Sequence, residues 1–309
     1  MGLGTSPFGN LFRETTTAET VEAVEAAWSG GVRYFDTAPH YGLGLAESRL
    51  GAAIAELPRD EYVVSTKVGR LLVPTPERAH ELDDDGFVVP AATRREWDFS
   101  RDGILRSLDS SLDRLGLDDI DVVYLHDPDD HWAEASTTGI DALVELREQG
   151  MIRAIGAGMN QTAMLAEFVR RCDVDIVMLA GRYTLLDQSA LDDLLPLALE
   201  RGVGVVAAGI YNSGLLARPE VPADAHFEYQ QAPPELVEKA REIAAICGRY
   251  GVTLPDAALQ FALRHPAVIS VVVGARDGRQ SAGGLERYAT EIPEELWSEL
   301  ESAGYVRSV

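Results

Sequence analysis

The segment IDVVYLH (residues 120–126) is an almost continuous apolar run, whereas TTGIDALVELREQ (137–149) carries its apolar side chains at helical spacing. Gly150 follows, where a glycine commonly ends a helix, and IRAIG (152–156) then starts a new short run. Residues 120–156 therefore predict a strand, a helix and a second strand, which is the repeating unit of a parallel sheet with covering helices.

The same alternation extends over the whole chain. Eight short runs are predicted strands, at 2–5, 33–36, 62–67, 120–126, 152–156, 175–179, 203–207 and 268–273. Helical spacing is found at 17–30, 45–57, 101–115, 137–149, 162–171, 187–201, 235–250 and 293–302. Because no Ser/Gly-rich or Pro-rich linker divides these repeats, we predict a single-domain (β/α)8 TIM barrel over residues 1–309, with an open doubly wound sheet as the alternative.

Composition excludes several classes of partner. The chain of 309 residues has 27 Lys and Arg against 50 Asp and Glu, a net charge of −23 that disfavours binding to nucleic acids and to anionic membranes. No apolar run approaches the ~18 residues that a spanning helix needs, and the first residues lack a secretory pattern. Cys172 and Cys247 form no CxxC motif, so we expect no disulfide framework, no metal site and a cytoplasmic protein.

Polar side chains end three neighbouring predicted strands. Asp36 ends the second strand, Lys67 the third and His126 the fourth, and Tyr41 follows Asp36 after five positions. In a barrel these strand ends meet at the functional face. An ammonium lowers the pKa of a nearby phenol by favouring the phenolate. We therefore expect Lys67, kept charged by Asp36, to lower the pKa of Tyr41 for proton exchange with an alcohol or carbonyl oxygen that His126 orients.

Two other patterns are discounted. GVGVVA (202–207) fits a GxGxxA dinucleotide turn, but its glycines precede a predicted strand instead of following one. The segment HDPDDH (126–131) has two histidines and three carboxylates, yet its proline prevents a helix from presenting them on one face, so we predict a turn.

The motifs FDTAPHYG (35–42), STK (65–67), YLHDPD (124–129) and GAR (274–276) resemble those of the aldo-keto reductase family, in the same order and over nearly the whole chain. Within that family, residues 97–130, 180–188 and 211–217 resemble the bacterial sugar dehydrogenases that act on L-fucose and D-threo-aldoses, with pyridoxal 4-dehydrogenase nearby.

The resemblance implies a barrel that binds NAD(P) across its C-terminal face. It implies Tyr41 as acid/base, Lys67 and Asp36 as the groups that tune it, and His126 as the group that orients the substrate. The remaining positions that it assigns to the cofactor are Thr5, Asn160, a pyrophosphate loop with Tyr211, Asn212, Ser213 and Leu215, and an adenosine-ribose loop over 274–280 with Gly274, Arg276 and Arg279.

Three departures from the family bear on specificity. Ala180 and Ala208 replace a common Gln and a common aromatic that stacks on nicotinamide, and Gly283-Gly284 replaces a Glu-Asn pair that grasps adenine. Tyr211 is the candidate to supply the stacking. A short hairpin that closes the barrel floor in relatives is not found before residue 2, so either the floor is open or the true start lies upstream. We expect the first residues to be strand and the apolar floor to be exposed until another segment covers it.

Cofactor choice depends on the loop after the last strand. Arg276 and Arg279 could clamp a 2′-phosphate, whereas Asp277 would repel it and could accept from a free 2′-hydroxyl. The acidic net charge also penalises the extra phosphate, so NAD is favoured and use of NADP stays open.

The resulting hypothesis is NAD(P)-dependent oxidation of an aldose at C1 to a lactone. Trp97, with Asp98 and Tyr229, is a candidate polar wall for the substrate in the long connections 69–98 and 209–234. The alternatives are a pyridoxal dehydrogenase or general aldehyde and ketone reductase, and, from another class, a cofactor-sensing binding subunit without turnover.

Overall fold

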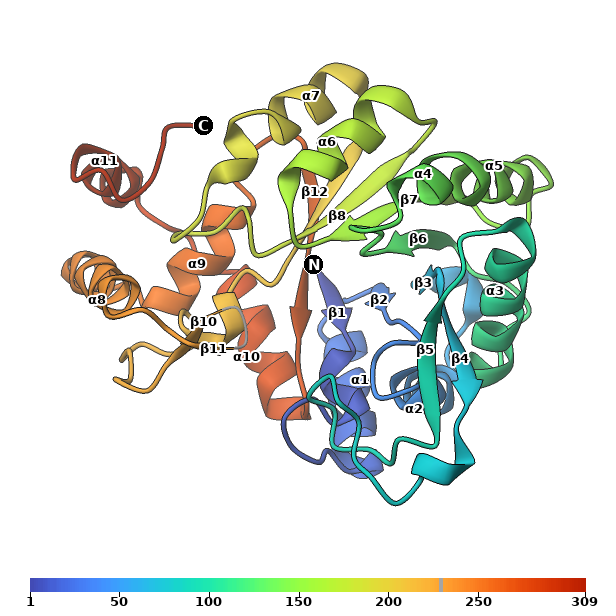
Figure 1. Cartoon of the computed structure of the whole chain (residues 1–309). Coiled ribbons are helices and arrows are strands. Elements are labelled where there is room, and N and C mark those ends of the chain that lie inside the picture. The colour runs from blue at the N-terminus through green and yellow to red at the C-terminus, as the bar shows by residue number, and fades with distance from the viewer. Residues whose placement is uncertain (228–229) are drawn as a thin grey trace.

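Eight parallel strands close into a barrel in the computed structural model, which describes residues 1–227 and 230–309 (Figure 1). Around the barrel the strand order is β1, β12, β9, β8, β7, β6, β3 and β2. Their bounds are β1 Gly2–Gly4, β2 Tyr34–Asp36, β3 Val63–Val68, β6 Val122–His126, β7 Ala154–Met159, β8 Ile176–Ala180, β9 Gly204–Ala208 and β12 Val268–Gly274. The barrel prediction is confirmed, and each strand lies within three residues of its predicted bounds.

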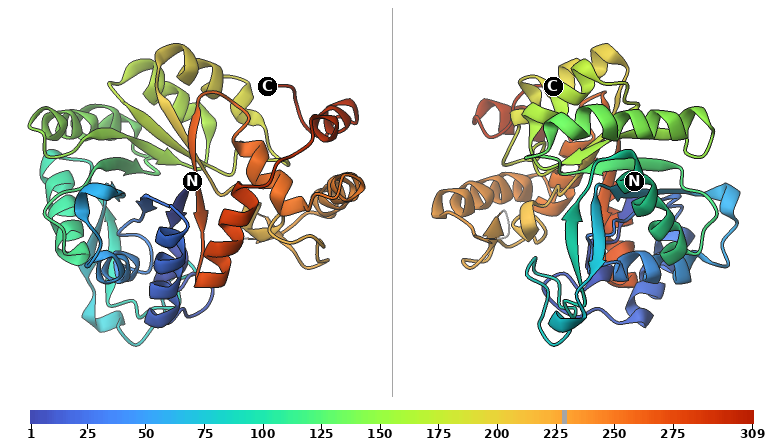
Figure 2. Two further views of the ribbon diagram at one scale, coloured as in Figure 1. Left: turned by 180° about the vertical axis from the view of Figure 1, so that it is seen from behind. Right: turned by 45° about the vertical axis from the view of Figure 1, so that its right-hand side comes forward.

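Helices form an outer ring around these strands (Figure 2). Those that follow or precede successive barrel strands are α1 Thr17–Ser29, α2 Leu45–Ile54, α3 Arg101–Leu115, α5 Ile140–Glu148, α6 Thr162–Arg171, α7 Leu194–Arg201, α9 Leu254–Ala262 and α10 Gly278–Tyr288. Two more, α8 Pro234–Arg249 and α11 Glu294–Ser302, pack on each other at the periphery, and a short α4 (Trp132–Glu134) leads through a π turn at Ala135–Gly139 into α5. Among the described residues no helix has the length and apolar character required to cross a membrane.

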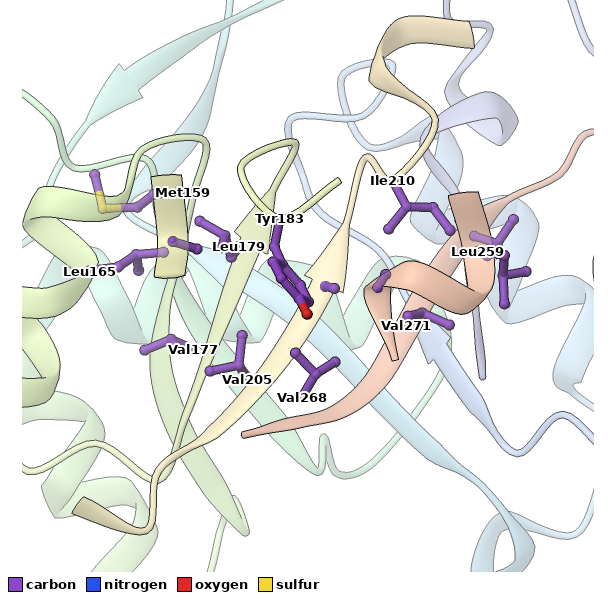
Figure 3. Close-up of a cluster of buried hydrophobic side chains, with 14 of the residues drawn as sticks. Met159, Leu165, Val177, Leu179, Tyr183, Val205, Ile210, Leu259, Val268 and Val271 are labelled. Carbon is purple, nitrogen blue, oxygen red and sulfur yellow. The ribbon is translucent and has the colours of Figure 1, made fainter. Parts of the chain in front are cut away.

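The strands are buried on both faces, which explains their continuous apolar runs. On β8, Val177 and Leu179 pack outward against the helices, while Met178 belongs to a separate cluster with Tyr124 inside the barrel. Figure 3 shows part of the outer layer, where side chains of β7, β8, β9 and β12 meet those of the covering helices; the labelled residues are Met159, Leu165, Val177, Leu179, Tyr183, Val205, Ile210, Leu259, Val268 and Val271.

Two helices and a hairpin were not predicted. Helix α9 starts with a capping box between Thr253 and Asp256, and α10 starts at an N-cap formed by Asp277, so residues 278–280 of the expected adenosine-ribose loop are the first turn of a helix. The connection 69–98 contains the antiparallel strands β4 (Arg70–Pro74) and β5 (Thr93–Trp97), whereas the described residues of 209–234 contain a 3-10 turn at Asn212–Gly214 and the short pair β10 (His226–Phe227) and β11 (Gln230–Gln231). Tyr229 lies outside the described residues.

The barrel floor is partly exposed, as expected. Tyr34 and Ile176 at the N-terminal strand ends are half-buried, and the side chain of Ile269 is 63% exposed. The ring of Tyr34 lies directly over Gly2, where a Cβ would come within 2.5 Å of it, and Ile269 lies over Gly204 in the same way. These two side chains occupy space that the glycines leave open. Cys172 and Cys247 are both free thiols.

Candidate active site

The C-terminal ends of β2, β3 and β6 open into a cavity of about 640 Å³. Asp36, Tyr41, Lys67 and His126 all line it, so the structure brings together the three residues that the sequence places at neighbouring strand ends and Tyr41 from the loop after the first of them. Register explains this convergence, because β3 pairs with both β2 and β6 and the three strands run parallel.

Lys67 and Asp36 form a buried ion pair at the base of the cavity. The ammonium of Lys67 donates to both carboxylate oxygens of Asp36, at 2.9 and 2.7 Å, and to the carbonyl oxygen of Thr37 at 2.9 Å. The hydroxyl of Ser65 donates to Asp36 Oδ1 at 2.7 Å. Only 2% of the Lys67 side chain and 4% of the Asp36 side chain are exposed. Burial alone would lower the pKa of Lys67, but attraction to Asp36 raises it above its ordinary value, so the ammonium stays charged.

The loop that carries Tyr41 is fixed by two close-packed glycines. A Cβ on Gly9 would lie 2.5 Å from the Tyr41 carbonyl carbon, and Gly42 has a φ of 63° with its Cα against the backbone of Gly9. A side chain at either position would therefore displace the loop. In this position the ring of Tyr41 lies 4.8 Å from the ammonium of Lys67 and perpendicular to the ring of His126.

The expected lowering of the pKa of Tyr41 is wrong. Burial is the largest influence and raises the pKa of Tyr41 to about 12, while the nearby Lys67 ammonium only partly opposes it. Tyr41 is thus a protonated phenol over the neutral pH range, ready to donate to a carbonyl oxygen.

His126 is a neutral imidazole in this site. Burial, together with the positive charges of Arg70 and Lys67, lowers its pKa well below the ordinary value. Its neighbour His40, whose ring centroid lies 5.4 Å away, has a pKa lowered to about 2, again mainly by burial. A neutral His126 can donate or accept a hydrogen bond at a substrate oxygen without competing for the proton of Tyr41.

The opposite half of the cavity is lined from the ends of β7, β8, β9 and β12. The small residues Gly158, Ala180, Ala208, Gly209 and Gly274 lie there beside the larger Met159, Met178 and Val272. Thr5 and Asn160 also line this half; the hydroxyl of Thr5 donates to the Asp36 carbonyl at 2.9 Å. The departures at Ala180 and Ala208 therefore leave open space beside Tyr41 that a flat ring could fill.

The other predicted cofactor residues lie away from this cavity. Asn212, Ser213 and Gly214 form a tight turn with three consecutive positive φ angles, an arrangement that costs energy outside glycine. Asn212 and Leu215 are buried, Ser213 is exposed, and Tyr211 is half-buried beside the guanidinium of Arg287.

The two predicted arginines of the last loop differ in their surroundings. The guanidinium of Arg276 donates to Thr15 Oγ1 at 2.8 Å and to the carbonyl oxygens of Leu11, Arg13 and Pro7. It therefore holds the loop after β1, although the sequence suggested a phosphate clamp. Arg279 is exposed on the first turn of α10, and the adjacent Asp277 caps that helix by accepting from the N–H of Gln280 at 2.8 Å.

The substrate half of the cavity contains residues that sequence reasoning missed. Trp97, 40% exposed, does not line the cavity; it stacks instead on Arg70, which does. The missed lining residues on this side are Leu11, Phe12, His40, Arg70, Gly86, Phe87 and Asp127. Two of them had a local signal, since Arg70 follows Lys67 by three positions and Asp127 directly follows His126 in the segment predicted as a turn. Asp85 also lines the cavity; it belongs to the acidic stretch 81–85, which the sequence left open between a substrate contact and a solvated loop.

The C-terminal face of this barrel combines a buried lysine–aspartate pair, a protonated tyrosine and a neutral histidine. These groups define a class of proteins suited to exchanging a proton with a carbonyl or alcohol oxygen. Comparison with known proteins identifies the class: residues 1–304 match the aldo/keto reductase family, to which this chain belongs. It is therefore an oxidoreductase of a family that uses NAD(P)H and acts on small aldehydes or sugars, and the predictions of family, fold and enzymatic nature are confirmed.

Three relatives illustrate the match. The chain is 49% identical to a D-threo-aldose 1-dehydrogenase from Pseudomonas sp over 98% of this chain and 93% of the relative. It is 39% identical to a pyridoxal 4-dehydrogenase from Microbacterium luteolum over 99% of this chain and 94% of the relative. A solved glycerol dehydrogenase from Gluconobacter oxydans superposes with a TM-score of 0.79 over 100% of this chain and 92% of its own; at 23% identity it supports the fold alone.

Proposed function

We propose that the protein oxidises an aldose at C1 to the lactone, with NAD as the favoured acceptor and Tyr41 as the acid/base. The observation that carries the proposal is the convergence of Asp36, Tyr41, Lys67 and His126 in one cavity. The 49% identity to a D-threo-aldose 1-dehydrogenase supports an aldose as the substrate.

A nicotinamide cofactor fits the residues present. The small side chains Gly158, Ala180, Ala208 and Gly274 leave room for a planar ring beside Tyr41, and the Asn160 side chain at the edge of the cavity offers amide groups to a carboxamide. When bound, the cofactor would accept the hydride that leaves C1 of the sugar.

The side chains of this protein would manage the proton. His126 holds the C1 hydroxyl beside Tyr41, and in the oxidation direction that hydroxyl gives its proton to the Tyr41 phenolate. The Lys67 ammonium, held in place by Asp36, stabilises the phenolate before it takes the proton. In the reverse direction Tyr41 donates the same proton to the carbonyl oxygen.

NAD is favoured over NADP because Arg276 is already engaged. The guanidinium of Arg276 donates hydrogen bonds to residues of the loop 7–15. In the segment 274–280, Arg279 is therefore the arginine that is left to bind a 2′-phosphate, and the nearby carboxylate of Asp277 would repel that phosphate. Comparing kcat/KM with NAD and with NADP tests this choice, and a large preference for NADP would contradict it.

The first test of the function is the Tyr41→Phe variant, assayed by nicotinamide absorbance with a panel of aldoses. Removing the hydroxyl should lower turnover by at least about 100-fold, because a positioned acid/base contributes this much, while cofactor affinity stays close to that of the wild type. Unchanged turnover would exclude the proposed role of Tyr41.

A second candidate function is oxidation of pyridoxal or reduction of other aromatic aldehydes. Two aromatic rings, Phe12 and Phe87, line the cavity and could pack against a pyridine ring, and the chain is 39% identical to a pyridoxal 4-dehydrogenase. Including pyridoxal in the same panel discriminates the two, since faster turnover of pyridoxal than of any aldose would favour this candidate.

A further inference from the structure

Beside the proposed acid/base group, the substrate half of the cavity contains a second charged pair, Arg70 and Asp127. Arg70 is the first residue of β4 and Asp127 directly follows β6. Nη2 of Arg70 donates to Oδ2 of Asp127, and both residues line the same cavity as Tyr41. The pair therefore adjoins the position at which a substrate oxygen would meet Tyr41 and His126.

Surrounding residues hold both members of the pair. The centre of the Trp97 ring lies 4.4 Å from the guanidinium carbon of Arg70, and this cation–π contact stabilises the position of the guanidinium. Asp127 has a φ of 42°, in the left-handed region that residues other than glycine adopt at an energetic cost, and its N–H donates to the Gly158 carbonyl at 3.0 Å. Strained backbone that is held in this way is common at functional sites.

Arg70 and Asp127 are largely shielded from solvent and still have polar atoms without a hydrogen-bond partner in the described part of the chain. Only 13% of the Arg70 side chain and 27% of the Asp127 side chain are exposed. Among the residues that the structure describes, none accepts a hydrogen bond from the buried Nε of Arg70 and none donates one to Oδ1 of Asp127. Burial raises the pKa of Asp127 and lowers that of Arg70, so each charge is only partly compensated by its partner.

We propose that Arg70 and Asp127 recognise the hydroxyl group on C2, next to the reacting carbon of a neutral polyhydroxylated substrate. A hydroxyl both donates and accepts, so it matches a carboxylate and a guanidinium that lie side by side. Asp127 Oδ2 lies 3.6 Å from Nε2 of His126, which would hold the C1 oxygen; the neighbouring oxygen of a sugar then falls beside the pair.

The charges also define which substrates are rejected. A lone arginine would suit a carboxylate or a phosphate, but Asp127 neutralises Arg70 and would repel an anionic substrate. A simple aldehyde offers no hydroxyl and would leave the remaining donors of Arg70 and Oδ1 of Asp127 unpaired, and unpaired buried polar groups are costly. Neutral sugars are therefore preferred over both. This inference rests on the proposed function, because it assumes oxidation of a sugar at C1.

The test compares an aldose with its 2-deoxy analogue in the wild type and in the Asp127→Asn and Arg70→Met variants. In the wild type, kcat/KM should be about 10- to 100-fold higher for the aldose, the usual effect of a hydrogen bond to a charged group. Each variant should lose most of this ratio through a higher KM for the aldose, with little change for the analogue. The double variant should lose less kcat/KM for the aldose than the two single variants predict when their effects are added on a free-energy scale.

Arg94→Met is the matched control, because Arg94 forms an exposed ion pair with Glu96 on the same hairpin, at 2.8 Å, and should leave the ratio unchanged. Equal losses for aldose and analogue in Asp127→Asn, or no loss, would overturn the inference. If the wild type oxidises no aldose, the proposed function itself fails; if it does so and the ratio survives in the variants, only this inference fails.

Discussion

Tyr41 is subject to two opposing influences on its pKa. Burial disfavours the phenolate, and the Lys67 ammonium favours it, with burial the larger of the two influences. Lys67 can act in this way only because Asp36 keeps it charged in a place where an isolated ammonium would lose its proton. The hydrogen bonds from Ser65 and to Thr37 fix the geometry of this pair.

The raised pKa of Tyr41 predicts different pH profiles for the two directions of reaction. Oxidation needs the phenolate, whose fraction grows about tenfold per pH unit below the pKa, so kcat/KM for oxidation should rise throughout about pH 6 to 9. Reduction needs the protonated phenol, which persists up to a pKa of about 12, so its rate should stay flat over that range. Steady-state rates in both directions, measured in buffers of constant ionic strength, provide the check.

The Tyr41→Phe variant is the control for these profiles, because its residual oxidation should lose the rise with pH. If kcat/KM for oxidation by the wild type stopped rising before about pH 8, the pKa of the Tyr41 phenol would be lowered, and burial could not be the dominant influence on it.

At the residue scale, strand-end positions were predictable and the partners of individual side chains were not. Asp36, Lys67 and His126 interrupt apolar runs, which marks them in the sequence. Nothing local shows that Arg276 bonds to residues 7–15, far away in the chain, or that the backbone turns Asp127 into the left-handed region. Such contacts depend on tertiary structure.

The loop between β4 and β5 contributes residues to the wall of the cavity. The cover loop (residues 82–90) includes Asp85, Gly86 and Phe87, which line the cavity. It pairs with the loop after β1, through a bridge between Leu11 and Phe87 and through the N–H of Val88, which donates to the Asn10 carbonyl at 3.0 Å. The cover loop thus connects two sides of the cavity.

Arg95 on β5 is predicted to hold the cover loop in place. Its guanidinium binds Asp83 at 2.6 and 3.0 Å and Asp85 at 2.8 Å, and donates to the His40 carbonyl at 2.9 Å. Arg95→Met should raise KM for the substrate several-fold and speed amide exchange in residues 82–90, because these bonds join the loop to the segment before Tyr41. Steady-state kinetics and hydrogen-exchange mass spectrometry measure the two effects.

Arg94→Met again serves as the control, since its side chain is exposed on the same strand. Amide exchange as slow in Arg95→Met as in the wild type would show that the backbone pairing alone holds the cover loop.

Helices were predictable where their apolar residues were regularly spaced. They were missed where tertiary packing stabilises a helix whose own residues disfavour it. Helix α10 contains Gly283 and Gly284, which disfavour a helix in isolation. It forms because it packs along α1, with the end of the Leu285 side chain lying directly over Gly30, where a Cβ would come within 2.1 Å of it. The β4–β5 hairpin was hidden for a different reason, because three consecutive charged residues, Arg94, Arg95 and Glu96, occupy the middle of β5 and break any apolar pattern there.

Over the whole molecule, the net charge of −23 opposes the binding of any anionic cofactor. The positive groups nearest the expected site are largely engaged: Lys67 with Asp36, Arg70 with Asp127 and Arg276 with backbone carbonyls. Arg279 is exposed, and its local attraction must compete with the field of the whole protein.

This competition predicts how salt changes the preference between the two cofactors. The additional phosphate of NADP meets more repulsion, and the Debye length shrinks from about 30 Å at 0.01 M to about 8 Å at 0.15 M ionic strength. The ratio of KM for NADP to KM for NAD should therefore fall as salt is added over this range. Arg279→Gln should raise KM for NADP at every ionic strength and change KM for NAD little. If the ratio increases with salt in the wild type and not in Arg279→Gln, attraction by Arg279 outweighs the acidic field, and the electrostatic argument for NAD is wrong.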